Sequence, residues 1–81
     1  MDQQLYAVWK ERIAVAGQRY RDARAVANAM MSEAGDLPVP DGQSALARAL
    51  WREREALREY TRLRVLFSRM VTGEIAPGET E

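Results

Sequence analysis

Cysteine and histidine are both missing from this sequence of 81 residues, and their absence excludes several kinds of chemistry. Without cysteine there is neither a disulfide nor a thiolate nucleophile, and without histidine the usual zinc, iron and copper sites lose their commonest ligand. No stretch approaches the ~20 consecutive apolar residues of a membrane span, because Arg or Glu interrupts every candidate. We therefore expect no metal, no cofactor and no membrane partner.

An excess of charge of either sign is also missing. Twelve Lys and Arg residues balance twelve Asp and Glu residues, so the formal net charge is zero. A neutral chain has no general attraction to nucleic acid or to anionic lipid. The first residues, 1–4, lack the basic segment and apolar run of a signal peptide, so we expect a cytoplasmic protein.

Proline is scarce, and its positions divide the chain. The segments 2–34 and 43–72 contain no proline and are rich in Ala, Leu, Arg, Glu and Gln, which favour helices. Between them, the segment 35–42 contains Pro38 and Pro40, which cannot continue a helix. The sequence therefore predicts one all-α domain, an antiparallel hairpin of two long helices joined by this turn.

Capping residues are expected at both ends of the second helix. Asp41 or Ser44 is the candidate N-cap, because its side chain can accept hydrogen bonds from the first free backbone N–H groups. Gly73 is expected to close the helix in the left-handed conformation. The remaining segment, 73–81, is predicted to be a flexible acidic tail.

Apolar residues recur at heptad spacing in both helices, as the inner seam of packed helices requires. Folding the chain back at Pro38 places residues opposite each other when their numbers sum to about 76. Tyr60 then faces the small Ala16, and Tyr20 faces the small Ala56. Tight packing needs such complementary sizes, and this match supports the antiparallel hairpin.

The two helices carry more apolar side chains than one seam can bury. Leaving each of them in water forgoes ~1.5–3 kcal/mol, and monomers rarely expose a large apolar patch. A two-fold dimer that forms a four-helix bundle would cover them. A different protein could supply the missing surface, but we favour self-association. The candidate interface residues are Val8, Val15, Leu50, Trp51, Leu57, Leu66 and Val71.

Glu53 is the one charged residue in the inner stripe of the second helix. One interpretation is an ion pair in the core with Arg19 or Arg24, or with an arginine of a dimer mate, which would fix the register of the helices. The other is an acid–base or ligand-binding carboxylate whose pKa is raised by burial. We favour the ion pair, because no catalytic constellation accompanies Glu53.

Arginines gather on one side of the second helix, where Arg48, Arg62 and Arg69 are spaced by one or two heptads. Guanidinium groups match phosphate oxygens, so these three residues are possible phosphate contacts. Glutamates at helical spacing among the arginines are typical of an ordinary solvated surface, which is the interpretation that we favour.

These patterns predict a small helical protein–protein interaction or adaptor module that acts as a homo-oligomer and performs no catalysis. One alternative is a nucleic-acid-binding hairpin that uses the arginine side of the second helix. The other is a small helical enzyme or ligand binder with Glu53 in its core. No motif singles out a family.

Overall fold

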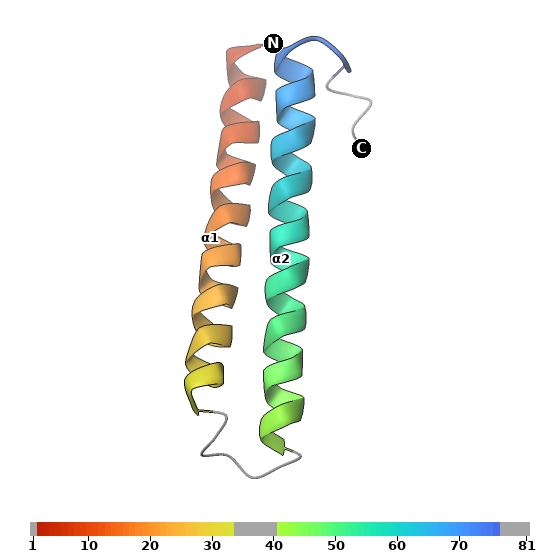
Figure 1. The fold of residues 1–81 in the computed structure, drawn as a ribbon. Coiled ribbons are helices and arrows are strands. Elements are labelled where there is room, and N and C mark those ends of the chain that lie inside the picture. Colours follow the sequence, from red (N-terminus) through yellow and green to blue (C-terminus); the bar gives the residue numbers. More distant parts are fainter. Residues whose placement is uncertain (1, 34–40, 77–81) are drawn as a thin grey trace.

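The computed structural model describes residues 2–33 and 41–76, apart from the side chains of 33 and 41–43. It contains two helices, α1 (Gln3–Glu33) and α2 (Asp41–Val71), which lie side by side and run in opposite directions (Figure 1). No described residue belongs to a β-strand. The predicted all-α hairpin is confirmed, and its dimerisation stays a prediction.

The first helix begins with an N-cap, Asp2, that was not predicted from the sequence. The backbone N–H of Gln4 donates a hydrogen bond of 3.2 Å to the side-chain oxygen Oδ1 of Asp2. The N–H of Tyr6 donates one of 2.9 Å to the carbonyl oxygen of the same aspartate. Asp2 therefore acts as the N-cap of α1, and its carboxylate satisfies one of the free donors of the first turn.

The second helix ends at Val71, and Gly73 closes it in the left-handed conformation, as predicted. This glycine has a φ of 82°, in the left-handed region. Its N–H donates to the carbonyl of Met70 at 3.2 Å, and the N–H of Glu74 donates to the carbonyl of Arg69 at 2.9 Å. These two bonds form a Schellman motif. The chain then turns back, and Ile75 packs against the hydrophobic core. The rest of the expected tail, 77–81, lies outside the described residues.

The start of α2 differs slightly from the expectation. The helix already includes Asp41, two residues before the predicted start, so Ser44 lies inside it and does not cap it. The side chain of Asp41 is outside the described part, so its capping role stays a prediction. Most of the predicted turn, 35–42, also falls on residues that the structure does not describe.

The hydrophobic core follows the seam between the helices. Its main cluster consists of Trp9, Ala16, Leu63 and Met70, which lie in the half of the hairpin away from the turn. In the other half the fully buried residues are small, because Ala27 and Ala49 line the seam there. The seam is thus formed by large side chains towards the chain ends and by alanines towards the turn.

Contacts across the seam fix its register. The Tyr6 and Phe67 rings have centroids 5.2 Å apart, and the Tyr20 and Tyr60 rings have centroids 6.3 Å apart. The residue numbers of these pairs sum to 73 and 80, on either side of the expected 76. Tyr20 was expected to face an alanine, and its ring stacks on Tyr60, a contact that the pairing did not predict.

Two small neighbouring residues make room for Tyr60. Ala16 is buried, and a Cβ atom added to Gly17 would lie 3.1 Å from Cε1 of the Tyr60 ring. The ring therefore lies over the Gly17 backbone as well as near the predicted Ala16. A one-to-one pairing gives each large residue a single partner, so this role of Gly17 was not predicted from the sequence.

Enlarging Ala16 should destabilise the hairpin. We expect Ala16→Leu to lower the free energy of unfolding by ~1–3 kcal/mol, because the added atoms enter a packed core. Ala14→Leu is the matched control: Ala14 is exposed on the same helix, and its substitution should cost less than ~0.5 kcal/mol. Thermal and urea unfolding at one fixed protein concentration measure the stability of both variants. Equal stability of the two variants would contradict this packing.

Candidate interaction surfaces

The hairpin has two broad faces, each composed of one side of α1 and one side of α2. Val8, Val15 and Val26 are separated by seven and eleven residues, steps that return to nearly the same side of a helix. Val15 lines a shallow groove with Glu59 and Leu63 of α2. We call this surface the Val15 face, defined by these five residues.

The opposite surface is formed by other residues. Ile13 lines a second groove with Arg64 and Phe67 of α2. Arg64 follows Leu57 by seven residues, and Leu57 follows Leu50 by seven, so these three share one side of α2. We call this surface the Leu57 face, defined by Ile13, Leu50, Leu57, Arg64 and Phe67.

The seven candidate interface residues do not lie on one surface. Leu50 and Leu57 belong to the Leu57 face. Val71 follows Arg64 by seven residues and so lies on the same side of α2. Two belong to the Val15 face: Val8 and Val15. Leu66 is half-buried against the core, and Trp51 lies on the outer side of α2, where it is 61% exposed. One flat interface could therefore cover only part of the predicted set.

Glu53 belongs to the Leu57 face, where it lines a groove with Leu50, Arg54 and Leu57. It is half-buried, and it forms no ion pair with a described residue. Arg19 lines the groove of the Val15 face, on the other side of the hairpin from Glu53. The ion pair in the core stays a prediction, and within one chain Arg19 is poorly placed to form it.

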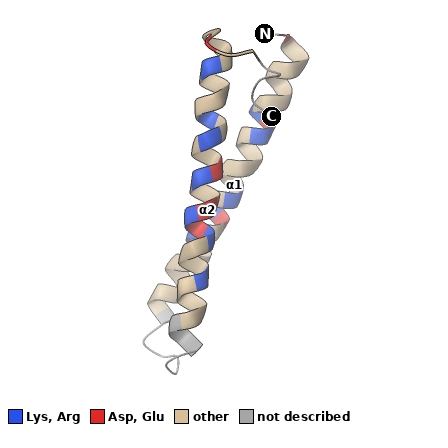
Figure 2. Ribbon diagram, turned by 90° about the vertical axis from the view of Figure 1, so that its right-hand side faces the viewer, with Lys and Arg blue, Asp and Glu red and all other residues tan. Residues whose placement is uncertain are grey.

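The arginines of α2 are interspersed with acidic residues, as Figure 2 shows along its length. Arg62 donates two hydrogen bonds, of 3.0 and 2.8 Å, to the two carboxylate oxygens of Glu59. Arg69 lies 3.7 Å from the carboxylate of Glu74. Arg48 lines a groove beside Val26. Phosphate contact by Arg62 and Arg69 would have to compete with these existing ion pairs.

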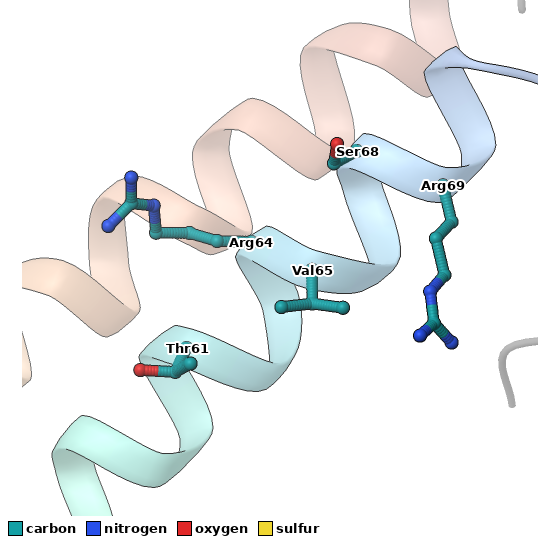
Figure 3. A pocket seen from close by; sticks show the side chains of 5 residues that line it. All are labelled: Thr61, Arg64, Val65, Ser68 and Arg69. Carbon is teal, nitrogen blue, oxygen red and sulfur yellow. The ribbon is translucent and has the colours of Figure 1, made fainter.

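A depression on the outer side of α2 offers no enclosed site. Figure 3 shows its lining residues, all from α2: Thr61, Arg64, Val65, Ser68 and Arg69. Arg64 and Arg69 extend from the helix in different directions, with Val65 between them. The Arg64 guanidinium lies 5.3 Å from the centre of the Tyr60 ring, so it covers an aromatic side chain of the seam.

Charges on the Val15 face connect the two helices. The Arg12 guanidinium lies 4.4 Å from the centre of the buried Trp9 ring and shields it from water. Hydrogen bonds from Arg62 hold the pKa of Glu59 below its usual value. Partial burial opposes this effect, and attraction to the positive charges of Arg62 and Arg12 adds to it.

Neither metal nor membrane chemistry is indicated in the described part of the chain. Residues 2–33 and 41–76 contain no group of three Asp or Glu side chains that could hold a metal ion. Neither helix, as far as it is described, is apolar enough to cross a membrane. No protein-family model, curated protein or solved structure matches the chain. Its function has to be argued from the geometry of its surfaces.

Removing the partner of Glu59 should raise the pKa of this residue. In Arg62→Gln we expect the pKa of Glu59, followed by NMR titration, to rise towards the usual glutamate value. Arg58→Gln is the control, because Arg58 pairs with Glu55. An unchanged Glu59 pKa in Arg62→Gln would contradict the assigned cause.

The same pair predicts the pH dependence of stability. Because the pKa of folded Glu59 is lowered, its stabilising effect is present above the unfolded pKa and is lost as pH falls through the folded pKa. The stability difference between wild type and Arg62→Gln should therefore shrink in acid. Both side chains are 49% exposed, so screening by solvent keeps the difference below ~1 kcal/mol.

Proposed function

We propose that this hairpin is a protein–protein interaction module that pairs with a second copy of itself through the Leu57 face. The pair would form a four-helix bundle and perform no catalysis. The observation that carries the proposal is the exposure of large apolar side chains on this face. Leu50 is 37% exposed, Leu57 is 42% exposed and Val71 is 55% exposed. No third described element covers them.

The Leu57 face is the better candidate for self-association because its apolar residues are continuous with the core. Ile13 and Phe67 are half-buried at its floor and already pack against the buried cluster. In a two-fold dimer every such contact is made twice. The groove of the Val15 face is lined by four charged residues, Glu11, Arg12, Arg19 and Glu59, whereas each of the two grooves of the Leu57 face is lined by two: Lys10 and Arg64 in one, Glu53 and Arg54 in the other.

An adaptor needs a second surface that stays accessible after it has paired. Trp51 lies on the outer side of α2, away from the Leu57 face, and most of its side chain is exposed. Exposed tryptophans are frequent anchors of protein interfaces. In the proposed bundle Trp51 would remain outside and could bind a different protein, which supports an adaptor role over a purely structural one.

Sedimentation equilibrium tests the proposal on the full chain. We expect the wild type to have twice the mass of one chain at micromolar concentration. Leu57→Gln should weaken the dimer by ~100-fold or more, because two buried leucines are lost per dimer and each contributes ~1.5–3 kcal/mol.

Val15→Gln is the matched control for this substitution. Val15 is 40% exposed, nearly as much as Leu57, but it lies on the opposite face. We expect this variant to dimerise like the wild type. A wild type that remains a folded monomer at 100 μM would overturn the proposed function. If Val15→Gln disrupts the dimer and Leu57→Gln does not, the interface lies on the Val15 face and the proposed interface is wrong.

A further inference from the structure

We infer that the two copies dock in parallel, with Glu53 of each chain paired to Arg24 of the other. This inference rests on the proposed function and adds to it the orientation of the dimer and the contact that sets this orientation. In this arrangement α2 of one chain packs against α1 of the second copy. The partner that fits the Leu57 face is thus a second hairpin with its turn at the same end.

Glu53 is the acid that an interface on this face must accommodate. Glu53 is half-buried and lines a groove with Leu50, Arg54 and Leu57, and a docked partner would cover these two leucines. Within the described chain it has no ion-pair partner. A carboxylate that loses its remaining water without gaining a cation is strongly unfavourable. A partner that docks here must therefore bring a positive charge to Glu53.

Arg24 lies on the same face as Glu53 and at the same height, so it is the cation that can meet Glu53 of a second copy. It follows Gly17 by seven residues and Ile13 by eleven, so it lies on the side of α1 that belongs to the Leu57 face. The numbers of Gly17 and Tyr60, which meet across the seam, sum to 77, and so do those of Arg24 and Glu53. Arg24 and Glu53 are therefore at the same height along the hairpin. Arg24 forms no ion pair with a described residue.

The distribution of charge on α1 decides between the two possible directions. The charged residues on the Leu57 side of α1 are all cations: Lys10, Arg21 and Arg24. The acidic residues Glu11 and Asp22 of this helix lie towards the Val15 face. Antiparallel face-to-face docking places α1 against α1 of the second copy, so that cations meet cations. Parallel docking places α1 against α2, which carries Glu53 on this face as well as Arg54 and Arg64, so fewer like charges meet than in the antiparallel arrangement.

The two-fold axis makes this contact reciprocal. Each dimer contains two identical pairs, Glu53 to Arg24 in one direction and Arg24 to Glu53 in the other. All four charges lie at one height, near the middle of the helices. Charged or polar groups at one position of an otherwise apolar helix interface are known to fix its register and orientation.

A charge-exchange experiment tests the inference. Glu53→Arg alone and Arg24→Glu alone should each weaken the homodimer by about tenfold or more, because each places like charges together. When the two variants are mixed, opposite charges meet again in both pairs. We expect native mass spectrometry to show heterodimers at close to the wild-type dimer affinity.

Mixing also separates a contact between chains from one within a chain. In the mixture each chain still has like charges at positions 24 and 53, so a pair within one chain cannot be restored. Rescue in the mixture therefore supports the contact between copies. If E53R dimerises as tightly as the wild type, the inference is overturned while the proposed function stands. A monomeric wild type would overturn both.

Two further variants control for charge and for direction. Glu55→Arg makes the same charge change on the other side of α2 and should leave the dimer affinity unchanged. Arg64→Glu tests the antiparallel arrangement, in which two copies of α2 lie together and Glu53 approaches Arg64 of the second copy. Rescue of E53R by R64E and not by R24E would overturn the parallel orientation.

The absence of cysteine allows a direct measurement of direction. Ser32 is exposed near the turn end of α1, and Ser32→Cys gives one site for a spin label on each chain. In a parallel dimer the two labels lie at the same end, less than ~30 Å apart. In an antiparallel dimer they are separated by the helix length of ~45 Å. Pulsed electron paramagnetic resonance measures the distance between the labels, and the longer distance would overturn the inference.

Discussion

Two helices packed side by side share a single seam, and this constraint governs the rest of the molecule. Each helix can turn only one side towards the other, so few of the described residues are buried: Trp9, Ala16, Gly17, Ala27, Ala49, Leu63 and Met70. The remaining surface must be polar, covered by long side chains or covered by a partner. The first two solutions occur along this hairpin, and the third is the one proposed for the Leu57 face.

Cations protect part of the seam without a partner. Arg12 lies over the Trp9 ring on one face, and Arg64 lies over the Tyr60 ring on the other. Long side chains of this kind cover apolar surface with their stems while the charge stays in water. Leu50 and Leu57 remain exposed, although Arg54 lines the same groove. Apolar surface therefore remains on both faces: Leu50 and Leu57 on the Leu57 face, and Val8, Val15 and Val26 on the Val15 face.

The sequence was sufficient to predict the helices, the direction of the second helix and a register close to the observed one. Proline-free segments and heptad spacing determine these features locally. Heptad spacing shows which residues share a side of one helix, but it does not relate the sides of two helices. The positions of Val15 and Leu57 on opposite faces could therefore not be predicted. Which sides of two helices adjoin depends on how each is rotated about its axis. The Tyr20–Tyr60 stack was missed for a related reason, since a large ring contacts several residues of the facing helix.

An apolar face gives affinity more readily than direction. Leucine and valine contacts are tolerant of how a partner is turned, so leucines alone would let two hairpins dock either way. In the proposed dimer the charges reduce this freedom, because the antiparallel arrangement would bring the cations of α1 together, whereas the parallel one pairs Arg24 with Glu53. The same residue would lower the stability of the dimer relative to a fully apolar interface. In the proposed dimer, Glu53 would thus lower affinity and add specificity for one arrangement of the two copies.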